Sequence, residues 1–186
     1  MRLRSRPSRR PGSTLVESAL VIAVFLLVLF GIFEYCRFLM VLHVANNAAR
    51  DGARYAVVNA NCDPSQATTV KATIISYTTA RMGSVERQIT GYQVAVYPCD
   101  AAGFAQSPPR VVPKSNSSST AADPFNSSDS NNPAWNSATF TERIAVTIRG
   151  TYRPITPLFV WAKWTNLYIM PDNIPINITA VMGSEG

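Results

Sequence analysis

The chain has 186 residues, of which 47% are hydrophobic and 15% are charged, and its formal net charge is +6. Residues 1–12 hold five of the 17 basic residues and no acid, so the rest of the chain, with 12 basic and 11 acidic residues, is almost neutral. The positive charge is therefore concentrated at one end, which excludes a basic domain surface for nucleic acid as its explanation. The length suits one domain with an appendage.

An apolar segment follows this basic leader. Residues 18–33 carry no charge, and counting back through Glu17 to Leu15 gives 19 residues. At ~1.5 Å per residue these span roughly 28 Å of helix, close to the hydrocarbon thickness of a bilayer. The leader arginines predict that the N-terminus stays in the cytoplasm and that the chain after Phe33 is exported.

The apolar segment is longer than the core of a removed secretory signal, and no A-x-A cleavage site closes it. We therefore expect a retained membrane anchor. A removed signal and a buried core helix are the weaker alternatives.

The helix is predicted to continue past the apolar segment, because no proline occurs between Thr14 and about Val58. Its second half has small residues at three- and four-residue spacing, which allow close approach of another backbone. These residues are Ala45, Ala49, Gly52, Ala53 and Ala56. Two interpretations stay open: this face packs on the chain's own globular domain, or it packs against neighbouring subunits in a bundle.

A second helix is predicted within the stretch "NCDPSQATTVKATIISYTTARMGS". Asp63 or Ser65 can cap its start, with Pro64 near the first turn. Gly83 supplies a left-handed stop at its end.

Three later segments alternate β-branched and polar residues, a pattern typical of strands in a sheet with one solvent-exposed face. The segments are "QITGYQVAVYP", "ERIAVTIRGTYRP" and "NIPINITAVM". Pro175 indicates that the last strand lies at an edge or begins late. Together with the two helices, the segments predict an α+β fold with a three- to four-stranded antiparallel sheet.

Cys62 and Cys99 flank the second helix and the first predicted strand, and both would be exported in the topology above. Disulfides form in oxidising compartments, so a Cys62–Cys99 disulfide is expected, with two buried thiols as the alternative. Closing this loop would stabilise the fold by ~4 kcal/mol on the chain-entropy model.

Two segments between the strands have contrasting compositions. Residues at about 105–138 are rich in Ser, Asn and Pro and predict a mobile surface loop, which Phe125 and Trp135 could pin locally. Residues 159–168 contain Phe, Trp and Tyr and are too apolar for a free loop. They either cover the core or form an aromatic patch near the membrane or a partner.

The sequence offers little catalytic or metal-binding chemistry. His43 is the only histidine, and no Cys-x-x-Cys accompanies it, so a metal site is poorly supported. No Gly-rich phosphate loop and no nucleophile elbow occur. We therefore expect a protein without enzymatic activity, cofactor or metal.

Glu17 is unusual because it stands at the leading edge of the apolar segment. A carboxylate in lipid costs roughly 2.5–3.5 kcal/mol on insertion scales, and a place in the headgroup zone is the simplest account of it. The neighbouring "RRPGSTLVE" suggests another, because Glu17 is the fifth residue after Gly12. If a peptidase cuts after Gly12, Ser13 becomes a positively charged N-terminus. The carboxylate then lies one turn, ~6 Å, along the helix, as a partner for an α-ammonium of its own chain or of the next subunit.

The motif at the start of the apolar helix resembles that of the type IV prepilin class. It consists of a glycine, four further residues and a glutamate, and it follows a basic leader. Over residues 12–58 the chain resembles, more specifically, the TadE-like family of tight-adherence (Flp-type) pilus biogenesis proteins. Matching positions in the opening are Val16, Glu17, Ala19 and Leu20, and those at the membrane exit are Gly31, Ile32, Glu34 and Arg37. Those in the third motif are Asn47, Ala48, Ala49, Arg50, Gly52, Ala53, Arg54, Tyr55 and Ala56. Residues 143–185 are similar to the family's tail as well.

The resemblance implies a minor pilin or pseudopilin, a non-enzymatic component in the biogenesis of a tight-adherence pilus. It implies a leader at 1–12 that a prepilin peptidase removes, a transmembrane and extended helix at 13–58, and an exported pilin-like domain at 59–186. The protein would sit in the bacterial inner membrane with its N-terminus in the cytoplasm, and it could enter the pilus. Its partners would be other pilins or pseudopilins, the inner-membrane assembly machinery and membrane lipid, but no nucleic acid. The alternative is a single-pass, membrane-anchored periplasmic binding or scaffold domain unrelated to pili.

Overall fold

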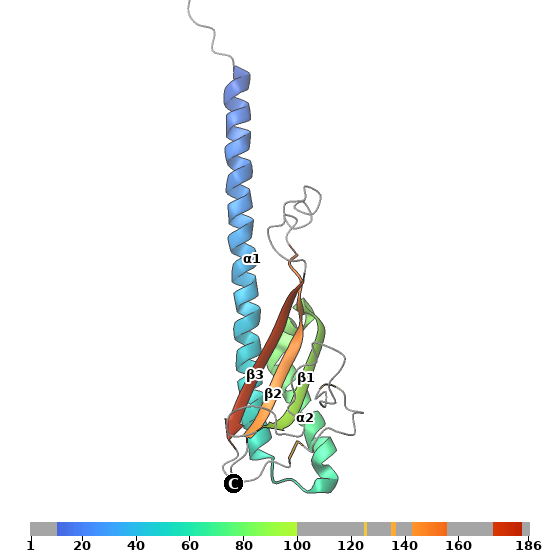
Figure 1. Cartoon of the computed structure of the whole chain (residues 1–186). Coiled ribbons are helices and arrows are strands. Elements are labelled where there is room, and N and C mark those ends of the chain that lie inside the picture. Colours follow the sequence, from blue (N-terminus) through green and yellow to red (C-terminus); the bar gives the residue numbers. More distant parts are fainter. Residues whose placement is uncertain (1–10, 100–124, 126–134, 137–142, 156–172, 184–186) are drawn as a thin grey trace, which may run out of the picture. The chain divides into compact units, whose positions relative to one another are not determined.

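The structure is a computed structural model that describes residues 11–99, 125, 135–136, 143–155 and 173–183. Within these residues lie two α-helices and three strands, with a short 3-10 turn before and after the second helix, and Figure 1 labels the helices and strands. The chain divides into two compact units, Met1–Arg37 with Pro154–Met170, and Phe38–Arg153 with Pro171–Gly186. The predicted mobile loop, apart from Phe125, Trp135 and Asn136, and the aromatic residues 159–168 lie outside the described residues.

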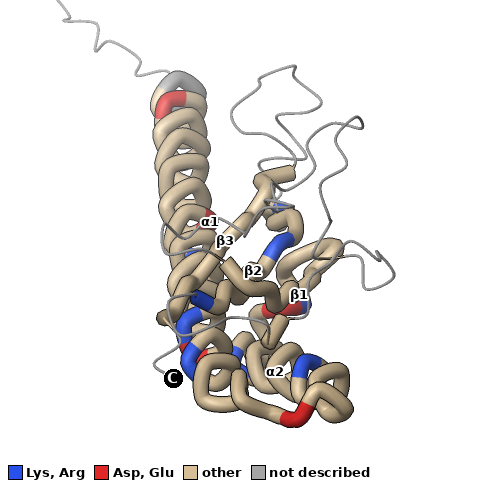
Figure 2. The backbone as a smooth tube through the Cα atoms, turned by 60° about the horizontal axis from the view of Figure 1, so that its bottom comes forward, with Lys and Arg blue, Asp and Glu red and all other residues tan. Residues whose placement is uncertain are grey.

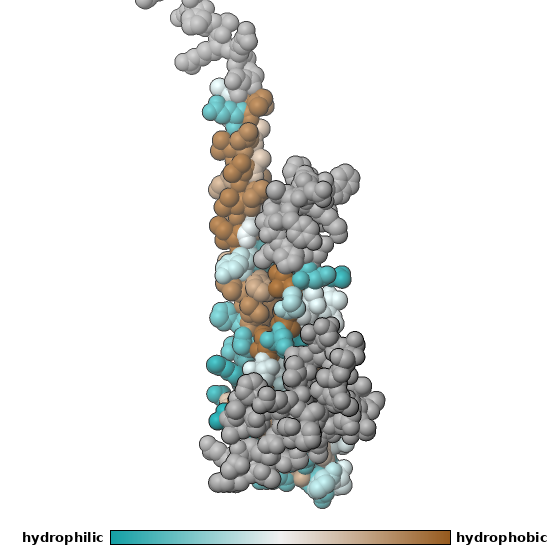
Figure 3. All heavy atoms as spheres, viewed as in Figure 1, coloured by the Kyte–Doolittle hydropathy of each residue, from teal (hydrophilic) through white to brown (hydrophobic). Residues whose placement is uncertain are grey.

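Helix α1 covers Pro11–Val58 without a break, as the absence of proline after Pro11 predicts. Its first half is apolar on all sides, and large side chains from Leu15 to Phe33 are exposed. The upper turns of α1 are accordingly coloured as hydrophobic in Figure 3. A helix of this kind belongs in lipid or among other helices. By length and composition it is a candidate membrane span, and none of its apolar window is buried inside the structure.

Helix α2 covers Ala67–Met82 and follows a 3-10 turn, η1, at Pro64–Gln66. Asp63 caps this turn, because its carboxylate accepts a hydrogen bond from the backbone N–H of Ser65 at 3.0 Å, and the hydrogen bonds from Ser65 lower the pKa of Asp63. Gly83 ends α2 with φ of 57°, a conformation that favours glycine. A second 3-10 turn, η2, at Gly83–Gln88 then leads into the sheet.

The three strands form one antiparallel sheet in the order β1-β2-β3. Their bounds are Ile89–Cys99 for β1, Arg143–Tyr152 for β2 and Ile174–Gly183 for β3. In the middle of the sheet Val96 pairs with Val146, which pairs with Ala180. Strand β3 is an edge of this sheet and contains Pro175, as predicted.

The apolar face of the sheet packs against the second half of α1 and against α2 in two clusters. One joins Val41 and Ala45 of α1 to Ile148 and Tyr152 of β2, and the Phe38 and Tyr152 rings lie 5.3 Å apart. The other joins α1 to Ile74 of α2, to Val96, Ile144 and Val146 of the sheet, and to Trp135. A long apolar helix, a second helix and a three-stranded antiparallel sheet confirm the predicted α+β class.

The prediction of one solvent-exposed sheet face is wrong for the centre of the sheet. Ala95, Ala145 and Thr147 point away from the main core, yet at most 4% of their surface is exposed. The Thr147 hydroxyl forms hydrogen bonds with the Tyr97 hydroxyl at 2.9 Å and the Thr179 hydroxyl at 2.8 Å. Burial raises the pKa of Tyr97. Small alanines and paired hydroxyls carry no strong hydrophobic signal, so alternation alone did not reveal this burial.

Candidate functional site

The predicted processing motif lies at the start of α1. Since α1 begins at Pro11, the backbone between Gly12 and Ser13 is already helical. Glu17 is exposed, and the Ser18 hydroxyl donates to the Thr14 carbonyl at 2.8 Å. Positions four apart lie on one side of a helix, so the helix carries Glu17 on the same side as Ser13. This arrangement suits a contact between a carboxylate and an amine at Ser13.

A second acidic residue of α1, Glu34, lies just beyond the apolar segment. The Glu34 side chain is only 4% exposed, and its carboxylate contacts the Arg37 guanidinium at 3.2 Å. The pair spans one helical turn, and Arg37 is itself mostly buried, with 18% of its side chain exposed. A buried carboxylate without a partner is strongly destabilising, so the ion pair with Arg37 offsets the cost of burying Glu34.

The small-residue face of α1 is buried within the second compact unit. Ala45, Ala49, Ala53 and Ala56 have no exposed surface, and all four belong to the two core clusters. In the second compact unit this face therefore packs on the chain's own sheet and on α2, rather than remaining open to another subunit.

Gly52 lies at a close approach of α1 to α2. A Cβ at this position would overlap the Thr78 hydroxyl and lie 3.3 Å from the Thr78 Cβ and Cγ2 atoms. Thr78 has no exposed surface, and its hydroxyl donates to the Ile74 carbonyl at 2.8 Å. A polar residue type does not predict this burial, because only the structure shows that the Thr78 hydroxyl is bonded within its own helix.

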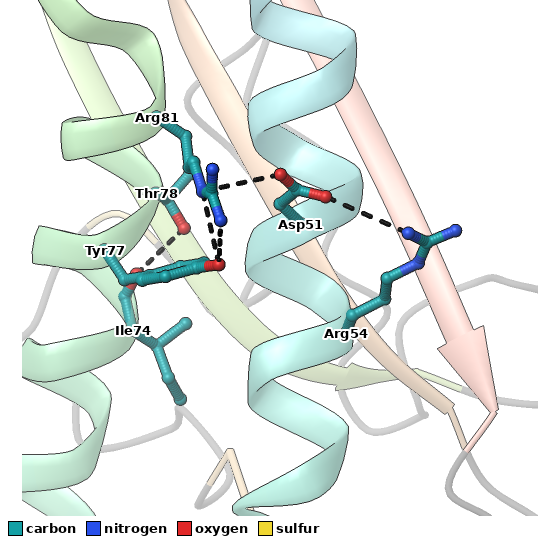
Figure 4. A network of polar contacts seen from close by, with 6 residues as sticks. All are labelled: Asp51, Arg54, Ile74, Tyr77, Thr78 and Arg81. Atoms are coloured by element: carbon teal, nitrogen blue, oxygen red, sulfur yellow. Dashed lines mark hydrogen bonds and ion pairs between the residues drawn. The ribbon is translucent and has the colours of Figure 1, made fainter.

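Polar residues cover the edge of this helix crossing (Figure 4). The Asp51 carboxylate lies 3.5 Å from Arg81 and 4.0 Å from Arg54. Arg81 also donates to the Tyr77 hydroxyl at 2.7 Å, and the Tyr77 ring stacks on Tyr55 with centroids 4.7 Å apart. The hydrogen bond to Tyr77, and then the charge of Asp51, raise the pKa of Arg81. The network ties α2 to α1 across the crossing.

A comparison with known protein families finds a match for most of helix α1. Residues 12–54 match the family described as TadE-like protein. This segment is TadE-like. The match confirms the resemblance over the processing motif, the Glu34–Arg37 pair and most of the third motif, and it stops at Arg54. The resemblance of residues 143–185 to the family's tail stays a prediction. No curated protein and no solved structure matches the chain significantly.

The TadE-like segment ends before the two cysteines of the predicted disulfide. The structure has Cys62 and Cys99 as thiols, not joined to each other. Cys62 packs against the core on the side of the sheet that faces the helices. Cys99 lies in β1, opposite Arg143. Because side chains alternate along a strand and Val96 faces the core, Cys99 faces the other side of the sheet. This strand parity separates the two sulfurs. The pairing remains a prediction that the intact mass of the unreduced protein would decide.

His43 is exposed on α1. Among the residues that the structure describes, no group of three or more His, Cys, Asp or Glu side chains is placed to hold a metal ion.

Trp135 is only 3% exposed, because it packs in the second core cluster. Its Nε1–H donates to the Ala67 carbonyl at 2.8 Å. Phe125 lies under the Arg149 guanidinium, 3.9 Å from ring centroid to carbon. The two aromatic residues of the Ser/Asn-rich segment thus contact α2 and β2.

Proposed function

We propose that this protein is a minor pilin or pseudopilin, a non-enzymatic component in the biogenesis of a tight-adherence pilus. The observation that carries the proposal is the TadE-like match over residues 12–54. The match associates the chain with Tad pilus assembly and includes Gly12, Ser13 and Glu17. The long apolar helix and the α+β unit that follows it along the chain support the same assignment.

In this proposal α1 anchors the protein in the inner membrane, with the arginine leader in the cytoplasm and the α+β domain exported. The positive-inside rule supports the orientation. A prepilin peptidase removes residues 1–12, which takes away five positive charges and leaves an α-ammonium on Ser13. The partners are other pilins or pseudopilins, the membrane and the assembly machinery.

Glu17 has a defined role in this proposal. Desolvation makes an isolated carboxylate unfavourable in lipid, while an opposite charge one helical turn away offsets part of that penalty. The Ser13 ammonium of the same chain or of a neighbouring subunit supplies the charge. Once the leader is removed, residues 13–33 carry one positive charge, the Ser13 ammonium, and one negative charge, Glu17. This apolar part of the helix can therefore leave the bilayer and join an assembly without a net charge.

Removal of the gene tests the proposal. We expect a strain that lacks it to lose surface pili, and a wild-type copy supplied in trans to restore them, with pili counted by electron microscopy. An undiminished number of pili in the deletion strain would contradict a role in assembly and leave the chain as a membrane-anchored scaffold domain.

A further inference from the structure

The second half of α1 has two faces with different roles. One face, with Val41, Ala45, Ala49, Ala53 and Ala56, is buried against the domain of the same chain. The other face, here called the outer face, is exposed and consists of Met40, His43, Asn47, Arg50 and Arg54. These five positions follow one another at spacings of three and four residues, so they form a continuous stripe along one side of the helix. A partner that packs along this part of α1 must contact the outer face.

The outer face carries positive charge that the chain balances only in part. Arg50 is exposed, and Arg54 has 71% of its side chain exposed. Asp51 is the acid beside them, but it also contacts Arg81 of α2 (Figure 4). The Asp51 carboxylate is therefore shared between two arginines, Arg54 and Arg81, and neither of these contacts goes to Arg50. Figure 2 shows basic positions on this part of α1, and no ion pair of Arg50 is found within the described ranges.

A second copy of the chain would not complement this charge. The acids of α1 are Glu17, Glu34 and Asp51, of which Glu34 is buried against Arg37 and Asp51 contacts Arg54 and Arg81. If two copies pack in parallel and in register, Arg50 faces Arg50, and a shift of one turn places Arg50 against Arg54. Asp63 and Glu86, the other acids that the structure describes, lie outside α1. Parallel self-packing thus brings like charges together, which disfavours a wrong partner.

We propose that the outer face of α1 binds a parallel helix of a different subunit that carries carboxylates one turn apart, and that it rejects a second copy of this chain. Arginine forks at positions 50 and 54 match such carboxylates in spacing and geometry. The parallel orientation rests on the proposed function, because both helices would enter the same membrane from the same side. The protein would then enter an assembly as a single copy among other subunits.

The inference can be tested without pili, so its failure is distinguishable from failure of the proposed function. The full chain is reconstituted in phosphatidylcholine vesicles, and association is measured by energy transfer between C-terminally labelled copies. The R50E/R54E variant supplies the missing acidic face. We expect wild type mixed with R50E/R54E to associate about tenfold more tightly than wild type alone, and rising salt to weaken this association because it screens exposed charges.

A matched control reverses two exposed arginines away from the outer face, R87E/R153E, and thus makes the same change in net charge. Wild type mixed with R87E/R153E should associate no better than wild type alone. The inference is overturned if wild type associates with itself as tightly as with R50E/R54E, or if both reversed variants behave alike.

A crosslinking experiment in the producing cells addresses the second copy directly. A photoreactive benzoylphenylalanine replaces Asn47 in cells that express two differently tagged copies of the chain. We expect no adduct that contains both tags, and an adduct with both tags as its main product would overturn the inference.

Discussion

Replacing Glu17 with alanine is expected to abolish recovery of the protein with surface pili while leaving it in the membrane. The substitution removes the carboxylate that the Ser13 ammonium would pair with. It also removes a charge that insertion into lipid disfavours by roughly 2.5–3.5 kcal/mol at a helix centre, so anchoring itself should not suffer. The measurement compares the amount of protein in membrane and sheared-pilus fractions by immunoblot.

Two further variants separate charge from shape at this position. Glu17→Gln keeps the size but not the charge, and it should fail as the alanine variant does. Glu17→Asp keeps the charge on a shorter side chain and should retain part of the incorporation. Ser18→Ala, which removes only the hydroxyl bonded to the Thr14 carbonyl, serves as a neighbouring control. Normal incorporation of Glu17→Gln would show that the charge pair is not needed.

Gly52→Ala is expected to lower the free energy of unfolding of the α+β unit. The new methyl group would overlap buried Thr78, and overpacking of this kind costs about 1–3 kcal/mol. Alanine gains about 1 kcal/mol over glycine in helix propensity, so a net loss of up to about 2 kcal/mol remains. Thr78 cannot yield easily because it is β-branched and its hydroxyl bonds the Ile74 carbonyl. Urea unfolding of the full chain in detergent, followed by near-ultraviolet circular dichroism, measures the change.

The same assay contains its own controls. Gly31→Ala adds a methyl group to α1 where a Cβ meets nothing within 4 Å, so it should not destabilise the domain. Thr78→Ala makes room at the crossing, and combined with Gly52→Ala it should give a coupling energy of about 0.5–3 kcal/mol in favour of the double variant. Strictly additive effects would refute the contact between these two positions.

The strands were predicted from their alternation of β-branched and polar residues, and the helices from a proline-free stretch and from capping residues. Alternation of Ile144, Val146 and Ile148 marked the core side of β2, and the uninterrupted stretch after Pro11 marked α1. Small residues on α1 indicated a close approach, but small side chains do not specify their partner. Only the structure shows that Gly52 meets Thr78.

Features that depend on distant residues could not be predicted in the same way. The buried hydroxyl of Thr147 and the polar network around Asp51 join elements that are separated in sequence. The Cys62–Cys99 disulfide was expected from the oxidising compartment and from the positions of the two cysteines in the chain. That expectation did not consider which side of the sheet the Cys99 side chain faces. The outer face of α1 became recognisable only after the buried face had been located.

The N-terminus of the mature protein tests the central claim most directly. Chain sequencing or intact-mass analysis of the protein from sheared pili should find Ser13 as the first residue, because a prepilin-type peptidase would cut after Gly12. A chain that begins at Met1 in assembled, functional pili would contradict the claim, since no α-ammonium would then lie one turn from Glu17.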